Sequence, residues 1–135
     1  MNMYDHFRAM YPKFFDEFRL ISFDCGWGWS PLLKEALDKV QDLGVRICVV
    51  QVKEKFGGLR VYVDPHEQTD HEEPRWPEVE NILESAQVKS FKTCEGCGTT
   101  EEVTTSGGWL KTLCPTCRAK NHWWEPDDTA NLVKT

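Results

Sequence analysis

Two pairs of closely spaced cysteines constrain the fold of this chain more than any other feature. Cys94 and Cys97 form one C-x2-C motif, Cys114 and Cys117 form a second, and sixteen residues separate the pairs. This spacing is typical of four-cysteine zinc sites, because two intervening residues let both sulfurs of a pair face one metal. Four thiolates complete a tetrahedron around Zn²⁺, so the predicted zinc is structural. Two disulfides are the alternative, which a cytosolic location disfavours.

The segment between the two cysteine pairs has the pattern of a hairpin. Residues 99–113 alternate around a Gly107-Gly108 turn, which predicts the two strands of a zinc ribbon. Ribbons of this kind bind nucleic acid, bind protein or only hold a fold together, and the sequence leaves these roles open. The other two cysteines differ in context: Cys48 lies in an apolar run typical of a core, and Cys25 lies in a glycine-rich loop without a nearby histidine.

Hydrophobic periodicity in residues 1–90 predicts both helices and strands. Apolar side chains recur at helical spacing in some stretches and alternate in others. We expect two short helices over residues 3–19, the second starting near Pro12, and further helices over 30–43 and 78–90. We expect strands over 45–53 and 59–64, joined by a turn at residues 55–58 as an antiparallel hairpin.

The predicted fold class is therefore α+β, with helices packed on a small antiparallel sheet and followed by a C-terminal zinc ribbon. We place an α+β domain at residues 1–90, the ribbon at 91–120 and a tail at 121–135. Trp123 and Trp124 in the tail are expected to fold back onto the ribbon or the helices.

Charge and composition narrow the classes of partner. The chain has 135 residues, 40% of them apolar, and a net charge of -6. Residues 64–84 hold eight acids and one arginine, which leaves the rest of the chain at +1. An acidic chain argues against sequence-blind binding of duplex nucleic acid but allows a local anion site. No apolar run can span a bilayer, and the N-terminus does not resemble a secretion signal, so we expect a cytoplasmic protein without membrane contact.

The stretch "QVKEKFGGLRVYVD" (residues 51–64) is the strongest candidate for an anion site. Side chains two apart on a strand share a face, so the predicted hairpin brings four of them together. An arginine fork and a lysine ammonium suit a phosphate. The residues expected to contact the ligand here are Gln51, Lys53, Lys55, Arg60 and Tyr62. Alternatively, the lysines only solubilise a hairpin or pair with nearby acids.

A loop at residues 23–29 is the expected companion of this stretch. Gly26 and Gly28 would let the backbone approach a ligand, and Trp27 and Trp29 would offer flat surfaces for a base. The following helix, expected to be capped by Ser30, would present free amides to an anion. The alternative is that both tryptophans belong to the core.

Four blocks of the sequence, "FDCGWGWSPLL", "QVKEKFGGLRVYVD", "SAQVKSFKTCEGCG" and "WLKTLCPTC", resemble a family of small, mostly uncharacterised proteins of phages and prophages. The resemblance covers about residues 20–118 and implies a phage-type accessory protein that acts in the host cytoplasm. By analogy with such accessory proteins, it favours a role in counter-defence, such as sequestering a nucleotide immune signal.

We therefore expect a non-catalytic binding protein that captures a nucleotide-like anionic ligand. The alternative is a zinc-ribbon adaptor that binds a host or phage protein or nucleic acid. An enzyme ranks last, because no nucleophile and base, metal triad or phosphate loop can be assembled from the sequence. The sequence also leaves homo-oligomerisation open.

Overall fold

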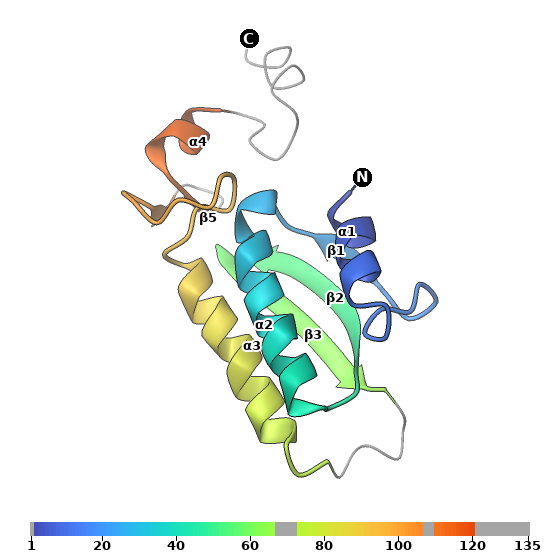
Figure 1. Cartoon of the computed structure of the whole chain (residues 1–135). Helices are drawn as coiled ribbons and strands as arrows, with labels where there is room; N and C mark the ends of the chain where they lie inside the picture. Colours follow the sequence, from blue (N-terminus) through green and yellow to red (C-terminus); the bar gives the residue numbers. More distant parts are fainter. Residues whose placement is uncertain (1, 67–72, 107–109, 121–135) are drawn as a thin grey trace.

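The computed structural model describes residues 2–66, 73–106 and 110–120 (Figure 1). Its centre is a three-stranded sheet with the strand order β1-β2-β3. Strand β1 runs parallel to β2, and β2 runs antiparallel to β3. The strands are β1 (Ser22–Asp24), β2 (Ile47–Lys55) and β3 (Gly58–Pro65), and the helices of this part are α1 (Met3–Met10), α2 (Ser30–Leu43) and α3 (Trp76–Ser90).

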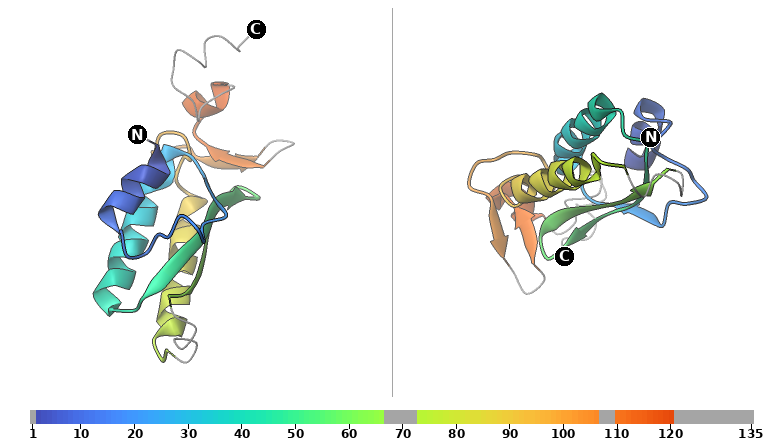
Figure 2. Two further views of the ribbon diagram at one scale, coloured as in Figure 1. Left: turned by 90° about the vertical axis from the view of Figure 1, so that its right-hand side faces the viewer. Right: turned by 90° about the horizontal axis from the view of Figure 1, so that it is seen from below.

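The fold class is α+β, as predicted, but the sheet is mixed and not antiparallel, because the unpredicted strand β1 pairs parallel with β2. Helices α2 and α3 lie side by side over one face of the strands, while the opposite face is left open by them (Figure 2). Strand β1 has only three residues and lies between the helix predicted to end at residue 19 and the loop predicted at residues 23–29. They pair with residues 51–53, and the Gln51 side-chain amide also donates to the Ser22 hydroxyl (3.1 Å). A run of three residues is too short to show a strand pattern in the sequence.

Helix α2 forms where the sequence places its start and stop signals. It begins at Ser30 with Pro31 in its first turn and ends at Gly44, whose φ of 76° suits glycine. The Ser30 side chain makes no capping bond, because a short 3₁₀ helix, η1 (Trp27–Trp29), runs directly into α2. The buried stripe of α2 faces the sheet and consists of Leu33, Ala36, Leu37 and Val40.

The predicted second helix after Pro12 is wrong. Its backbone instead bonds to the edge of β2: the Phe14 carbonyl accepts from Val49, and Ile21 donates to Val50. Phe14 points into the core, whereas Phe18, expected on a buried helix face, is 91% exposed. The edge of β2 thus competes successfully with local helix formation for these backbone groups.

A β-bulge at Val50 determines which side chains of β2 face the core. Val49 pairs with Val63 and Gln51 pairs with Tyr62, so one residue of β2 has no counterpart. The bulge lets Val49 and Val52 both face the core. It also places Gln51 and Lys53 together on the opposite face of the sheet.

Residues 94–106 and 110–119, which carry the four paired cysteines, form a small layer at the end of the sheet where β2 turns into β3 (Figure 1). Strands β4 (Thr104–Ser106) and β5 (Lys111–Leu113) pair antiparallel, and α4 (Pro115–Ala119) follows. We call residues 94–106 and 110–119 the cysteine unit. The predicted strands of this hairpin are present, while the Gly107-Gly108 turn, Trp123 and Trp124 lie outside the described residues.

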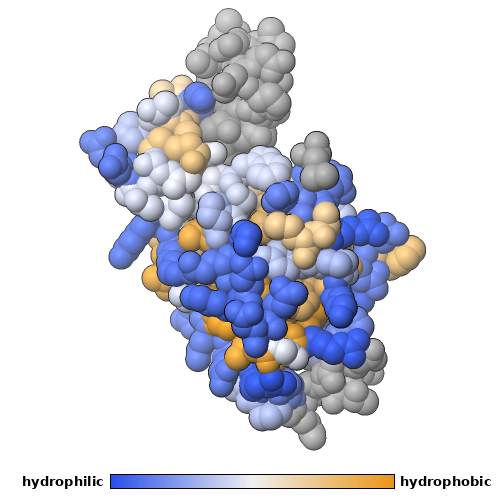
Figure 3. All heavy atoms as spheres, viewed as in Figure 1, coloured by the Kyte–Doolittle hydropathy of each residue, from blue (hydrophilic) through white to orange (hydrophobic). Residues whose placement is uncertain are grey.

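The helix side of the molecule is covered mainly by hydrophilic side chains, with smaller apolar areas between them (Figure 3). This is the surface expected of amphipathic helices whose apolar stripes face a sheet. Across the described ranges, no helix is both long and apolar enough to cross a membrane.

Candidate functional site

The four cysteines of the two motifs lie together, as their spacing predicts. Their sulfur atoms are all within 4.8 Å of one another, and the Sγ atoms of Cys97 and Cys114 are 3.8 Å apart. A tetrahedral zinc site with Zn–S bonds of about 2.3 Å has sulfurs about 3.8 Å apart. All six cysteines are free thiols, so the two disulfides considered from the sequence do not form. The cluster is therefore compatible with a bound metal ion.

Backbone amides around the cluster donate hydrogen bonds to two of the sulfurs, which favours the thiolate form that binds a cation. The amide of Cys97 points at the Cys94 sulfur, and the amide of Cys117 points at the Cys114 sulfur. Burial disfavours the Cys94 thiolate, but hydrogen bonds from neighbouring amides outweigh it and lower the pKa of this thiol to about 7. A thiolate is the form that binds metal.

The glycine-rich loop before α2 packs against the cysteine unit rather than against an open site. A methyl group on Gly28 would lie 2.2 Å from the carbonyl oxygen of Cys94. The Gly28 amide donates to the Glu95 carbonyl (2.9 Å), and the Gly26 amide donates to the Glu95 carboxyl (3.0 Å). The two glycines that were expected to approach a ligand are thus bonded to Glu95 instead.

The turn at Phe56-Gly57 is covered in the same way. Both residues have positive φ (54° and 86°), which is the geometry of a type I′ turn, and they lie within the turn predicted at residues 55–58. A methyl group on Gly57 would lie 2.5 Å from the Thr105 side chain, and the Thr112 hydroxyl donates to the Gly57 carbonyl. The glycine therefore allows the cysteine unit to pack closely on the turn.

The strands beyond the turn do bring the predicted side chains together. Lys53 lies directly opposite Arg60, and Gln51 lies directly opposite Tyr62. Strand β1 adds Asp24 beside Lys53 and Ser22 beside Gln51. We call this open surface of the sheet the polar face, and it consists of Ser22, Asp24, Gln51, Lys53, Arg60 and Tyr62.

The two cations of the polar face have no acidic partner within 4 Å among the described residues. The Lys53 ammonium lies 5.6 Å from the centre of the Tyr62 ring. The Arg60 Nε atom is buried and has no hydrogen-bond partner in the part of the chain that the structure describes. Like charges directly opposite each other destabilise a sheet, and the neighbouring Asp24 on β1 offsets part of this repulsion.

The two tryptophans of the loop have different environments. Trp29 is fully buried, and its indole N–H donates to the Thr93 carbonyl (2.8 Å). It is therefore a core residue, and the prediction that it stacks on a ligand is wrong. Trp27 is 46% exposed and contacts the edge of the His6 ring. Lys55, also predicted as a ligand residue, is exposed beside the turn, with its ammonium near the Phe56 ring.

A cavity of about 880 Å³ opens between β1, the start of α1 and the cysteine unit. We call it the β1 cavity. Its lining includes three of the predicted ligand residues together with residues that sequence analysis missed. The predicted ligand residues in the lining are Trp27, Gln51 and Lys53. The residues that sequence analysis missed include Tyr4, Glu95 and Lys111.

Glu95 is the main residue that sequence analysis missed, since it looks like a spacer within the first C-x2-C motif. It is 1% exposed, and its Oε1 atom has no hydrogen-bond partner among the described residues. Burial raises the pKa of this carboxyl to about 7, because the Gly26 amide and the Lys111 charge only partly replace its hydration. A single acid between two cysteines carries no sequence signal for such a position.

The thiol of Cys25, in the lining of this cavity, has low reactivity. Cys25 lines the β1 cavity, and its sulfur lies 3.9 Å from the Met3 sulfur. Burial raises the pKa of the Cys25 thiol, and the charges of Glu95 and Asp24 raise it further. Cys25 therefore stays protonated and is a poor nucleophile.

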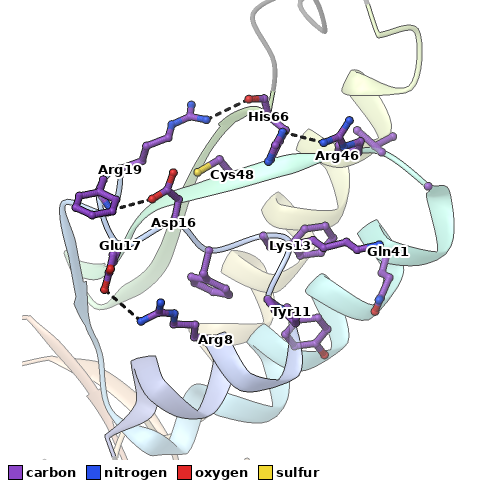
Figure 4. A pocket seen from close by; sticks show the side chains of 16 residues that line it. Arg8, Tyr11, Lys13, Asp16, Glu17, Arg19, Gln41, Arg46, Cys48 and His66 are labelled. Atoms are coloured by element: carbon purple, nitrogen blue, oxygen red, sulfur yellow. Dashed lines mark hydrogen bonds and ion pairs between the residues drawn. The ribbon is translucent and has the colours of Figure 1, made fainter.

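A second cavity of about 820 Å³ lies at the other end of the sheet, between residues 8–19 and the start of β2 (Figure 4). Its arginines are engaged with protein groups. Arg8 pairs with Glu17 (3.3 Å), Arg19 donates to the His66 carbonyl (3.2 Å), and Arg46 contacts the His66 ring nitrogen Nδ1 (3.2 Å). These contacts fasten the loop to the sheet.

Comparison of the chain with protein family models, with curated proteins and with solved structures found no match.

Proposed function

We propose that this protein is a non-catalytic binding protein that captures a nucleotide-like anionic ligand on the polar face and in the β1 cavity. The observation that carries the proposal is the Lys53–Arg60 pair. The two cations lie directly opposite each other, and the buried Arg60 Nε atom has no hydrogen-bond partner among the described residues. Buried polar groups nearly always have a partner, and an anion would supply one to both cations.

Trp27 and the β1 cavity support a nucleotide rather than a bare anion. The cavity volume of about 880 Å³ falls within the range of small-molecule sites, roughly 300–1,000 Å³. Lys53 borders the cavity, and Trp27 lines it with half of its surface exposed. A base stacked on Trp27 would gain about 1–3 kcal/mol.

The chemistry of the cavity supports binding without catalysis. Its only thiol among the described residues, Cys25, is held in the protonated form. Together with the resemblance to phage proteins, this favours a sequestering role in the host cytoplasm, in which a counter-defence protein holds a nucleotide signal intact.

We further propose that the ion of the cysteine unit is zinc. Four cysteines in tetrahedral spacing leave no open coordination position, so the ion would hold structure. Glu95 and Lys111 of this unit line the β1 cavity, so the ion would support one wall of the ligand site.

The alternative function, a zinc-ribbon adaptor, has less support. Thr112 of β5 bonds to the Gly57 carbonyl, and Lys111 pairs with Glu54 of β2 (2.7 Å). The strand that an adaptor would present is thus engaged in packing within this chain. Homo-oligomerisation would leave this argument unchanged.

Calorimetric titration with nucleoside 5′-monophosphates tests the proposal. Arg60→Ala should weaken binding roughly ten- to hundredfold, the expected loss for one charge-assisted contact, without lowering the melting temperature. Arg8→Ala removes the same charge at the second cavity and serves as the control. The nucleotides should be recovered unchanged after release. Equal affinity of Arg60→Ala and the unmodified protein for every nucleotide would contradict the proposal.

A further inference from the structure

Strand β3 is an outer strand of the sheet, and part of its backbone lacks partners. Only β2 lies beside it. The Leu59 amide points away from β2, because it donates to the Ser90 hydroxyl of α3 (2.8 Å). The backbone groups of a strand point to its two sides in turn, so those of Val61 and Val63 also point away from β2. Among the described residues, these two valines have no backbone hydrogen bond on that side.

The sheet treats its other side differently. The Phe14 carbonyl and the Ile21 amide bond to the side of β2 that faces away from β3. Within the described ranges, no loop or strand bonds to the outer side of β3 in this way. Uncovered edges pair readily with other strands, so proteins seldom leave a long one open. Val61 and Val63 pack on the core but are only partly buried, as expected at an open edge.

The free amides of this edge form a short, defined set. At one end, Ser90 already binds the Leu59 amide. At the other end, Pro65 has no amide hydrogen. The amides left to pair with another strand are therefore those of Val61 and Val63, together with the carbonyls on the same side.

We propose that this edge pairs with the β3 edge of a second copy of the chain, antiparallel, around a two-fold axis at Tyr62. Val61 of one copy then lies opposite Val63 of the other, and each such pair exchanges two backbone hydrogen bonds. Both free amides of each copy are used. The same patch serves on both copies, as in most symmetric dimers, and the two sheets become one.

The side chains select this register, because hydrogen bonding alone would also allow shifts of two residues. With the axis at Tyr62, Arg60 of each copy lies opposite Asp64 of the other, and opposite charges across a ladder attract. A shift of two residues in either direction removes both of these pairs. Within its own chain, Asp64 has only an exposed pair with Arg19 (3.7 Å). Arg60 carries five N–H donors, so the new pair leaves donors for a phosphate.

Sedimentation velocity of the full chain without nucleotide tests the proposal. The chain should pass from a monomer of 15.7 kDa to a dimer as its concentration rises. The useful range is roughly 1–500 µM, since a small interface predicts a weak dimer. Arg60→Asp and Asp64→Arg should each weaken the dimer at least about tenfold, because each places like charges opposite each other.

The double variant, with both substitutions, restores opposite charges and should recover the dimer to within about threefold of the unmodified protein. Asp42→Arg makes the same change of charge at an exposed position of α2 and should leave the dimer unchanged. Should Arg60→Asp not fold, Asp64→Asn takes its place. It removes the attraction without adding repulsion, so its dimer should be intermediate in strength between those of the unmodified protein and Asp64→Arg.

A monomer at every concentration would overturn the proposal. A dimer that withstands Asp64→Arg would also overturn it, because the contact would then lie elsewhere. Loss of the dimer in both single variants without recovery in the double variant would overturn the register. Nucleotide binding is measured separately by calorimetry, so failure of the dimer and failure of the proposed function are distinguishable.

Discussion

The two cavities of this protein are nearly equal in volume, about 880 Å³ and 820 Å³, but their polar groups are used differently. In the second cavity, Arg8, Arg19 and Arg46 each contact a protein group. At the β1 cavity and the polar face beside it, three buried polar atoms lack partners among the described residues, and none of these atoms lines the second cavity.

The difference shows that a cluster of cations is weak support for an anion site. Arginines that bond to acids and carbonyls are already satisfied, and an added anion would have to displace those contacts. Lys53 and Arg60 have no acid to displace in the part of the chain that is described. The state of hydrogen bonding, more than charge or volume, separates a candidate site from a packed loop.

Loss of a metal ligand should have the largest effect on the difference between the two cavities, because the cysteine unit lines the β1 cavity but not the second cavity. Cys94→Ser should release the ion and unfold the cysteine unit, since structural zinc supplies on the order of 10 kcal/mol to small zinc domains. Nucleotide binding should be lost. Metal analysis, melting curves and calorimetry would measure this. Retention of nucleotide binding in metal-free protein would contradict the proposed wall.

The tryptophan pair gives the next largest effect. Trp29→Ala should lower the free energy of unfolding by about 3–5 kcal/mol, because it empties a fully buried site and removes the bond to Thr93. Trp27→Ala should cost less than about 1 kcal/mol of stability but weaken nucleotide binding by about 1–3 kcal/mol. Denaturant titration and calorimetry separate the two effects. Similar stability losses for both variants would show that Trp27 is also a packing residue.

The smallest effect is expected at the second cavity. Arg19→Ala removes an exposed pair with Asp64 and a bond to the His66 carbonyl, so stability should fall by less than about 1 kcal/mol. Binding of every nucleotide should stay unchanged. A loss of nucleotide affinity comparable to that of Arg60→Ala would remove the distinction between the two cavities.

Local patterns predicted most of the regular elements correctly. The Pro31 and Gly44 signals define α2. The apolar run over 45–53 and the alternation over 59–64 define the hairpin, which places Lys53 opposite Arg60. The cysteine spacing likewise predicts the sulfur cluster. These features depend on residues close in sequence, or on one metal site, which is why a single sequence suffices for them.

Features that depend on distant partners were not predictable in the same way. The short β1 strand and the loop after Pro12 are set by the edge of β2, not by their own residues. The sequence shows that Gly28 and Gly57 allow close approach, but it does not show that the cysteine unit is what approaches. Trp27 and Trp29 are two residues apart, and only the 3₁₀ turn reveals that one is buried and the other exposed.

The bond between Gly26 and Glu95 joins residues 69 positions apart. During synthesis, the glycine-rich loop leaves the ribosome well before the residue that completes the β1 cavity. The wall formed by Glu95 and Lys111 is therefore the last part of this cavity to be synthesised. If the proposed function holds, a chain that stops before residue 94 should not bind a nucleotide.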